Sequence, residues 1–359
     1  MLDLLAALLL AAQPGLSMTD IQVVGTHNSY KQAIPKAEMD AMLAVSPLAL
    51  GIDYAHRPLT EQLDAGARQI EIDVLHDPQG GRYAKPLTAL GGGIPVDAAF
   101  QAAMAKPGFK TLHIPDIDFR SSCLTFVACL TQISTWSKAH PGHAPMLIML
   151  NAKTGKASMP GGVAALDFDA AAWDALDAEI RSVFGDGRLI TPDQVRGGHA
   201  TLREGVLAGG WPKLDAARGK VFFALDEKGE KIASYLAGHP SLQGRAMFVN
   251  TDEASPAAAY LTINDPLKAG ERIRAAVRQG FIVRTRADSE TIEARGADTT
   301  RRTAAFASGA QYVSTDYLWP DPRFPSYAVR LPNGAAVICN PVRAERCAGR
   351  QLETVGAQP

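Results

Sequence analysis

Short apolar runs alternate with longer amphipathic segments along most of the chain. The apolar runs have the length typical of strands, and we predict strands at 21–27, 68–75, 110–114, 146–151, 220–225, 246–250, 281–285 and 312–315. Between them, apolar residues at helical spacing, or helix start and stop residues, predict helices at 123–140, 170–184, 266–279 and 299–308.

This alternation predicts the fold class. Eight strands that alternate with helices favour an α/β protein with a (β/α)₈, TIM-type barrel. The alternative is a doubly wound open sheet. We disfavour it because no Gly-x-Gly-x-x-Gly motif follows the first strand.

We place the barrel at 19–317 as a single domain. The two ends of the chain lie outside it. Residues 318–359 are rich in Pro, and we expect a C-terminal extension packed on the barrel. Residues 1–18 hold an apolar run from Leu2 to Ala12 that is too short to span a bilayer, which predicts a signal peptide. The run lacks a positive start and contains Asp3, so an upstream start or an amphipathic first helix stays open.

Four cysteines occur as two local pairs, Cys123 with Cys129 and Cys339 with Cys347. An even count in close pairs fits two disulfides in an oxidising compartment, and four reduced thiols are the alternative. Taken with the predicted signal peptide, the pairs predict both disulfides and a secreted or periplasmic protein.

Overall composition narrows the classes of partner. Hydrophobic residues make up 47% of the 359 residues, which is enough for a buried core. The formal net charge is −1, so no basic field draws the protein to nucleic acid. We expect no nucleic-acid partner and a monomeric protein.

Polar side chains gather where the predicted strands end, which is where barrel enzymes carry their working residues. Glu71 and Asp73 are two apart on an extended run, so both carboxylates face the same side. Such an oxygen-rich pair suits a divalent cation. Asn28 can add an amide oxygen, and His27 beside it can serve acid–base chemistry. The pattern predicts metal-assisted phosphodiester chemistry.

Two further strand ends carry less specific candidates. His113 lies between apolar neighbours, where a histidine is more often structural, but phosphodiester cleavage needs a second proton-handling group. We therefore interpret His113 as catalytic. Lys153 could hold a phosphate as a point charge, and an ordinary exposed lysine is an equal alternative.

Arg284 and Arg286 share one face of the seventh predicted strand. An inward pair of arginines needs anions, either a substrate phosphate or carboxylates such as Asp252 and Asp316. We predict substrate binding by this pair, with at least one arginine in a carboxylate network.

Four fragments carry a resemblance to a known family: Gly25-Thr26-His27-Asn28-Ser29-Tyr30, Gln62-Leu63-Asp64-Ala65-Gly66-Ala67-Arg68-Gln69-Ile70-Glu71-Ile72-Asp73, His113, and Asn151-Ala152-Lys153. From about Ile21 to Tyr317, the chain resembles phosphatidylinositol-specific phospholipase C, most closely the bacterial calcium-dependent type. The resemblance implies a Ca²⁺-using phosphodiesterase barrel. Its substrate would be an inositol phospholipid, cleaved to diacylglycerol and a cyclic or open inositol phosphate.

The resemblance also implies roles. His27 would stabilise the phosphoryl oxygens in the transition state, and His113 would be the general acid. Asn28, Glu71 and Asp73 would be ligands of one Ca²⁺, with Glu71 also a candidate base for the inositol 2-hydroxyl.

One position departs from the family pattern. Asn151 stands where eukaryotic relatives place a carboxylate ligand. An amide oxygen can still bind a cation, but the lost charge should weaken Ca²⁺ binding or require help from Asp116 or Asp118.

Two alternatives stay open. Glycerophosphodiester phosphodiesterases share the Glu-x-Asp feature, but their His-Arg-Gly opening is absent because Asn28 follows His27. A catalytically inactive secreted protein that binds inositol phosphates or lipids is the other alternative, and the presence of both His27 and His113 argues against it.

A phospholipid substrate implies transient contact with a membrane surface. The candidate contact segment follows the first strand and holds the apolar residues Met42, Leu43, Val45, Leu48 and Leu50. The alternative, a buried helix that caps the barrel, is slightly favoured.

Overall fold

The structure is a computed structural model that describes residues 15–87, 93–347 and 352–355. The predicted signal peptide therefore lies almost wholly outside the described residues. In the described part of the chain, no helix combines the length and apolar character that a membrane crossing requires.

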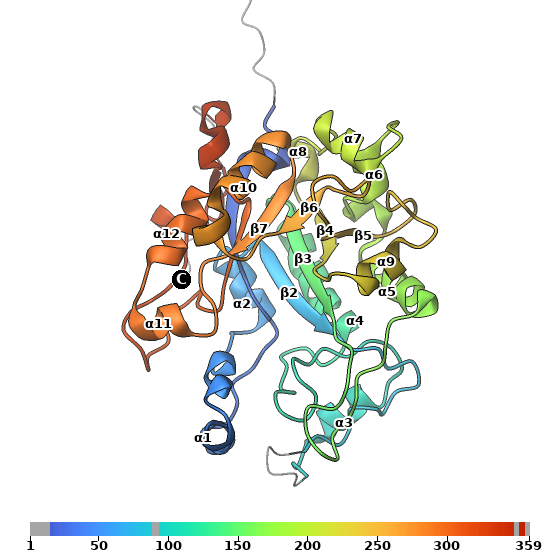
Figure 1. Cartoon of the computed structure of the whole chain (residues 1–359), viewed down its shortest axis with the longest axis vertical. Coiled ribbons are helices and arrows are strands. Elements are labelled where there is room, and N and C mark those ends of the chain that lie inside the picture. The colour runs from blue at the N-terminus through green and yellow to red at the C-terminus, as the bar shows by residue number, and fades with distance from the viewer. Residues whose placement is uncertain (1–14, 88–92, 348–351, 356–359) are drawn as a thin grey trace, which may run out of the picture.

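Parallel strands form the centre of the molecule (Figure 1). They are β1 Ile21–Thr26, β2 Gln69–Val74, β3 Met146–Ala152, β4 Val221–Leu225, β5 Met247–Val249, β6 Tyr260–Thr262, β7 Ile282–Arg286 and β8 Tyr312–Thr315, and the short β9 is Ile338–Cys339. One sheet has the order β2-β3-β4-β5 and the other β6-β7-β8-β1-β9. Side chains on both faces of these strands are buried, which is why the strands appear in the sequence as continuous apolar runs.

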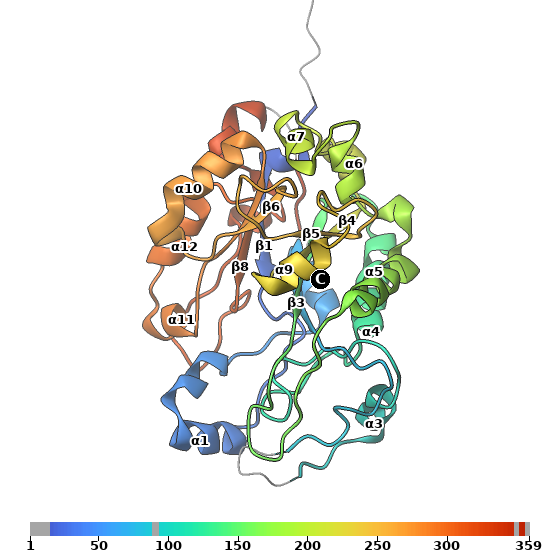
Figure 2. The same cartoon turned by 45° about the vertical axis from the view of Figure 1, so that its right-hand side comes forward.

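Helices lie on both sides of the strands, with α10 and α12 on one side and α4, α5 and α9 on the other (Figures 1 and 2). The helices are α1 Lys36–Val45, α2 Leu59–Asp64, α3 Ala98–Met104, α4 Phe126–Ala139, α5 Ala170–Phe184, α6 Pro192–Arg196, α7 Leu202–Leu207, α8 Leu214–Ala217, α9 Glu230–Leu236, α10 Pro266–Gln279, α11 Ile292–Gly296 and α12 Thr300–Ala307. Short 3₁₀ turns are η1 Met18–Asp20, η2 Pro47–Ile52, η3 Asp186–Arg188, η4 Pro332–Gly334 and η5 Pro341–Cys347. The four predicted helices are present as α4, α5, α10 and α12.

One predicted strand is wrong and one strand was missed. Residues 110–114 are not a strand, because Lys110 bridges Leu75 in the antiparallel sense and so runs back across the end of β2. The missing member of the series is β6, which follows β5 after a connection without a helix. Its three residues are too few to give a periodic signal.

The strands do not form one continuous ladder. At one seam a single parallel bridge joins Asn250 to Tyr260, between β5 and β6. At the other, Arg68 N donates to Val24 O at 2.8 Å, between β1 and β2. The observed architecture is a mixed α/β domain with two sheets, and the closed barrel stays a prediction.

Beyond residue 318, two described segments contact the strands. The short β9 pairs antiparallel with the start of β1, with Cys339 opposite Ile21. Arg68, at the start of β2, forms an ion pair with Glu353. Both predicted disulfides, Cys123–Cys129 and Cys339–Cys347, are present.

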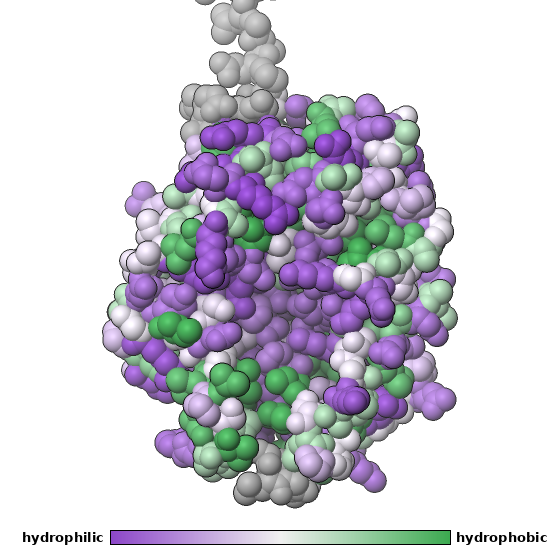
Figure 3. Space-filling view, in the orientation of Figure 1, coloured by the Kyte–Doolittle hydropathy of each residue, from purple (hydrophilic) through white to green (hydrophobic). Residues whose placement is uncertain are grey.

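The long loops after β1 and β2 carry α1 and α3 beyond the strands, toward the lower part of Figure 1. Asp116 ties this region together, because its carboxylate accepts hydrogen bonds from Leu87 N at 3.2 Å and Val163 N at 2.8 Å. Between the two groups of loops, the surface has a hollow lined by hydrophilic residues (Figure 3).

Candidate active site

The residues after β1 are joined directly to β2. Asn28 has a φ of +46°, a left-handed conformation that asparagine tolerates better than most residues. The chain then turns so that Ser29 N donates to Glu71 O at 2.9 Å, and Glu71 N donates to Ser29 Oγ at 2.8 Å. His27 and Glu71, predicted from separate fragments, are therefore neighbours.

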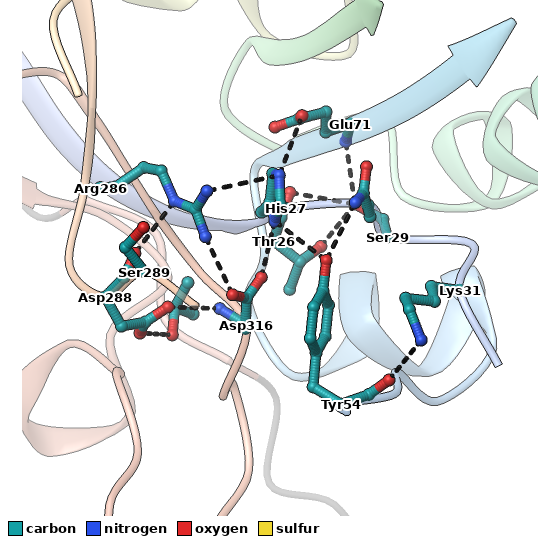
Figure 4. A network of polar contacts seen from close by, with 12 residues as sticks. Thr26, His27, Ser29, Lys31, Tyr54, Glu71, Arg286, Asp288, Ser289 and Asp316 are labelled. Atoms are coloured by element: carbon teal, nitrogen blue, oxygen red, sulfur yellow. Dashed lines mark hydrogen bonds and ion pairs between the residues drawn. The ribbon is translucent and has the colours of Figure 1, made fainter. Parts of the chain in front are cut away.

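His27 lies at the centre of a polar cluster (Figure 4). Its Nδ1 lies 2.7 Å from Asp316 Oδ1 and 3.1 Å from the hydroxyl of Tyr54. On the other edge of the ring, Nε2 lies 3.6 Å from Glu71 Oε1 and 3.5 Å from an NH1 nitrogen of Arg286. A carboxylate can only accept, so Nδ1 carries a hydrogen and Nε2 is the unprotonated nitrogen of a neutral ring.

The electrostatics agree with a neutral His27 ring. Burial, reinforced by Arg286, lowers the pKa of His27 to about 3. Burial alone would raise the pKa of Asp316, but Arg286 and His27 lower it to about 2. Arg286 pairs with Asp316 at 2.9 Å, so one carboxylate holds both an imidazole and a guanidinium.

The backbone of Asp316 is held in place by Asp288, a residue that the sequence pattern did not identify. Asp316 N donates to Asp288 Oδ1 at 2.8 Å, and the Thr315 hydroxyl donates to the other carboxylate oxygen. Burial and the nearby Asp316 raise the pKa of Asp288 to about 7.

The two predicted acidic ligands are both buried and both paired. Glu71 accepts from Asn151 Nδ2 at 2.9 Å and pairs with Arg284 at 2.7 Å. Burial raises the pKa of Glu71 to about 7, although Arg284 opposes the rise. Asp73 Oδ2 accepts from Tyr30 at 2.7 Å and pairs with Lys153 at 2.8 Å.

Two observations test whether these residues suit a cation. Asp73 Oδ1 is buried without a hydrogen-bond partner, which is the sign of a missing donor or cation. Asn28, Glu71, Asp73 and Asn151 offer oxygen atoms, which Ca²⁺ prefers. Within the described ranges, no group of three or more His, Cys, Asp or Glu side chains is arranged to hold a metal ion. The residues fit a hard cation, with a low ligand charge.

His113 lies in a bend and not in a strand, but it is still partnered as a functional histidine is. Its Nδ1 lies 2.8 Å from Asp118 Oδ2. The pair is close because Ile114 and Asp118 exchange backbone hydrogen bonds across a tight turn. Asp116 and Asp118 make these loop contacts, so the structure does not place either of them as a third acidic ligand beside Glu71 and Asp73.

The three predicted substrate-binding cations lie in the same region, each paired with a carboxylate. Arg284 meets Glu71, Arg286 meets Asp316, and Lys153 meets Asp73. Asp252 instead caps its own loop, accepting from Ala254 N and Ser255 N. Tyr54 and Lys31 were missed, because loop residues carry no periodic signal, and Asp118 was named only as a possible cation ligand and not as the partner of His113.

Comparisons with known proteins show which family the chain belongs to. A sequence model of the family described as phosphoinositide phospholipase C, Ca²⁺-dependent, matches residues 16–341. The chain belongs to this family. As a member of the Ca²⁺-dependent phosphoinositide phospholipases C, it is a phosphoric diester hydrolase that acts on inositol phospholipids. No curated protein sequence matches it.

Solved phospholipases C of this kind share the fold. A calcium-dependent phosphoinositol-specific phospholipase C from Pseudomonas sp., in its myoinositol complex, aligns with a TM-score of 0.57 and 17% identity over 91% of this chain and 96% of that one. A Ca²⁺-dependent phosphatidylinositol-specific phospholipase C from Streptomyces antibioticus aligns with a TM-score of 0.52 and 20% identity over 84% and 95%.

Proposed function

We propose that this phospholipase cleaves the bond between phosphorus and the diacylglycerol oxygen of phosphatidylinositol, using the inositol 2-hydroxyl as nucleophile. A new bond from that oxygen to phosphorus forms as the diacylglycerol bond breaks, which gives diacylglycerol and a cyclic inositol phosphate. The observation that carries the proposal is the His27–Asp316 pair, in which Nδ1 lies 2.7 Å from Oδ1. Nε2, on the other edge of the ring, lies 3.6 Å from Glu71 Oε1 and can accept a proton from a hydroxyl bound beside it.

His27 is assigned the proton of the attacking hydroxyl. Asp316 occupies Nδ1 and stabilises the imidazolium that forms when Nε2 takes up that proton. The sequence had favoured Glu71 for this task and phosphoryl contact for His27. We propose His27 as the base instead, because Asp316 holds its Nδ1 and leaves Nε2 free to accept a proton, while Glu71 is assigned to the cation.

His113 keeps its predicted role as general acid. A leaving alkoxide needs a proton, and the carboxylate of Asp118 stabilises a protonated imidazole that can supply it from Nε2. Arg286 is assigned to the phosphoryl oxygens, because its guanidinium lies beside the nitrogen that receives the hydroxyl proton.

We also propose that Asn28, Glu71, Asp73 and Asn151 hold one Ca²⁺. When bound, the ion supplies Lewis-acid stabilisation to a phosphoryl oxygen and lowers the pKa of the attacking hydroxyl. The cations of Lys153 and Arg284 already balance the two carboxylates, so Ca²⁺ must compete with them. The family dependence on Ca²⁺ supports the ion, and the unpartnered Asp73 oxygen supports its place.

Transient membrane contact is proposed through a rim patch, defined as Val45, Leu48, Leu50 and Ile292. Val45 is 75% exposed, Leu48 83% and Ile292 65%. The Thr291 hydroxyl donates to Leu50 O at 3.1 Å, which brings the start of α11 beside η2. Hydrophobic residues gather over α1 at the lower edge of the hollow (Figure 3).

The apolar segment after β1 thus has one buried face and one exposed face. Met39 and Met42 of α1 pack inward with Ile34, as the capping alternative predicted. Val45 and Leu48 are exposed, and exposed apolar side chains at the edge of a lipid-binding site favour insertion among lipid headgroups.

Three further expectations, on localisation, fold and the C-terminal extension, complete the proposal. The two disulfides support a place of action outside the reducing cytoplasm, either secreted or periplasmic. We also propose a monomer with a signal peptide at 1–18. The contacts at both seams support a single (β/α)₈ barrel at 19–317. The extension at 318–359 completes it by way of β9.

The proposal is tested with the purified chain on vesicles of phosphatidylinositol, with phosphatidylcholine and glycerophosphoinositol as comparison substrates. We expect a cyclic phosphate by ³¹P NMR from phosphatidylinositol, lost on chelation and in a His27→Ala variant. Cleavage of glycerophosphoinositol alone would favour the glycerophosphodiesterase alternative. Tight binding without cleavage would favour the inactive lipid-binding alternative.

A further inference from the structure

A fully buried lysine lies between the two loops that carry the candidate histidines. Lys31 is 0% exposed, and its Nζ lies 3.1 Å from Asp118 Oδ2 and donates to Tyr54 O at 2.8 Å. The same ammonium lies 4.9 Å from the centre of the Tyr54 ring. A lysine is almost never fully buried unless it is paired, so this placement calls for a reason.

Each partner of Lys31 contacts one of the histidines. Asp118 Oδ2, which accepts from Lys31, also accepts from His113 Nδ1 at 2.8 Å. Tyr54 places its hydroxyl 3.1 Å from His27 Nδ1 (Figure 4). One cation therefore links the support of the proposed acid to the support of the proposed base.

Main-chain contacts hold this arrangement in place. His56 N donates to Lys31 O at 2.9 Å, and Ser122 N donates to Tyr30 O at 2.8 Å. Lys31 and Ser121 also form an isolated antiparallel bridge. The segment that follows His27 thus lies between the loop of Tyr54 and the loop of Asp118.

The charge of Lys31 has a specific consequence for Asp118. Asp118 is fully buried, and its Oδ1 has no hydrogen-bond partner. Removal of the cation would leave an uncompensated buried charge, which favours movement of the Asp118 side chain toward water. That movement would take away the acceptor that fixes the Nδ1 hydrogen of His113.

A second buried lysine provides a comparison inside the same chain. Lys110 is also 0% exposed and pairs with Asp77 at 3.2 Å. Its other contacts are to the main-chain oxygens of Lys106 and Gly108. Lys110 therefore has the same burial and the same type of partner, but its contacts join loop to loop and reach neither histidine.

We propose that Lys31 and Asp118 are positioning residues for His113, and that Lys31 also fixes the Tyr54 loop against His27. The inference rests on the proposed role of His113 as general acid. The new element is that a buried ion pair, Lys31–Asp118, orients His113, and that its cation comes from the loop that follows His27.

The test compares Asp118→Asn, Lys31→Met and the control Lys110→Met on two inositol phosphodiesters, one with an alkoxide leaving group and one with a phenolate. A phenolate leaves without a proton, so it does not need the general acid. We expect Asp118→Asn to lower kcat about 10²-fold on the alkoxide substrate and less than threefold on the phenolate. Lys31→Met should show the same selective loss. Lys110→Met should change both substrates alike, even if it lowers stability.

A second measurement does not depend on turnover. Side-chain ¹⁵N NMR identifies which nitrogen of a histidine ring carries hydrogen. We expect the His113 ring to be protonated at Nδ1 in the wild type, to change in Asp118→Asn and Lys31→Met, and to stay unchanged in Lys110→Met. If Lys31→Met does not fold, Asp118→Asn, which keeps the shape of the side chain, decides the question.

The double variant Lys31→Met with Asp118→Asn should be no worse on the alkoxide substrate than Lys31→Met alone, because the two residues act through one contact. An equal loss on both substrates, or an unchanged His113 ring, overturns the inference while a wild type active on phosphatidylinositol keeps the proposed function. An inactive wild type overturns the proposed function itself. The His113 spectra would still show whether the ion pair holds the ring.

Discussion

The Nδ1 atom of His27 lies 2.7 Å from Asp316 Oδ1, and Arg286 holds the other oxygen of that carboxylate at 2.9 Å. His27, which directly follows β1, thus receives its orienting anion from the residue that directly follows the neighbouring strand β8. An imidazole fixed in this way presents Nε2 to the hollow with a single tautomer. Catalysis by His27 should therefore depend on a residue almost three hundred positions away in the chain.

Asp316→Asn should lower kcat on phosphatidylinositol about 10³-fold, because an amide no longer selects the Nδ1-protonated tautomer. Steady-state kinetics with a thermal unfolding control measure the effect. Asp321→Asn is the matched comparison, since Asp321 pairs with Arg323 at 2.7 Å and not with His27. Equal losses in the two variants would contradict the assigned role.

Lys153→Met should tighten Ca²⁺ binding about tenfold, or about 1.4 kcal/mol, because Lys153 holds Asp73 Oδ2 at 2.8 Å and competes with the ion. Isothermal titration calorimetry measures the affinity without substrate. Lys231→Met is the control, since Lys231 pairs with Glu227 at 2.9 Å. Weaker binding in Lys153→Met would show that the lysine supports the site.

His113→Ala should slow a substrate with an alkoxide leaving group about 10²-fold more than one with a phenolate, because the phenolate needs no proton. His27→Ala should slow both substrates alike, since proton removal from the attacking hydroxyl is common to them. Parallel kcat measurements on the two substrates check the division of roles. The same leaving-group response in both variants would refute it.

Val45→Asp with Leu48→Asp should weaken binding to phospholipid vesicles, because two exposed apolar side chains of the rim patch are replaced by charges. We expect about tenfold lower activity on vesicles and unchanged activity on a monomeric, water-soluble substrate. Leu207→Asp, at an exposed position on α7, serves as the control. A loss on both substrate forms would assign the patch to folding.

Acid should destabilise the protein through His143, whose Nε2 lies 2.6 Å from Ser137 Oγ and whose Nδ1 lies 2.6 Å from Ala144 O. Burial lowers the pKa of His143 to about 4. The unfolded ring takes up a proton near pH 6.5, but the folded ring does so only near pH 4, so stability falls as the pH falls between these values. The contribution is on the order of 3 kcal/mol. Urea unfolding of the wild type and His143→Gln at pH 8 and pH 4.5 should show a smaller drop in the variant.

The strands and helices that carry long apolar patterns could be predicted from the sequence, and so could the residues at their ends. His27, Glu71, Asp73 and Asn151 are brought together because parallel strands end at one edge. The pattern failed at 110–114, where an apolar run serves a loop that turns back over β2. It also failed at β6, which is too short for periodicity.

The supports of the site could not be predicted in the same way. Tyr54, Lys31 and Asp118 lie in loops whose conformation is set by contacts with distant segments. Asp116 is an example. Its φ is +69°, and its carboxylate joins Leu87 and Val163, which lie far from it in the sequence. An ion pair between Arg284 and some carboxylate could be expected from the sequence. That the carboxylate is Glu71 depends on how the strands are arranged in space.

The pairing of β1 also sets a timetable for folding. β1 forms its strand ladders with β8 and β9, so the strand that leads to His27 gains its ladder partners only after residues 312–339 have been synthesised. At ribosomal speeds of about 5–20 residues per second, that delay is roughly 15 to 60 seconds. The sheet that leads to His27 is therefore completed only near the end of synthesis, and the pairing of His27 with Asp316 must form after most of the chain has been made.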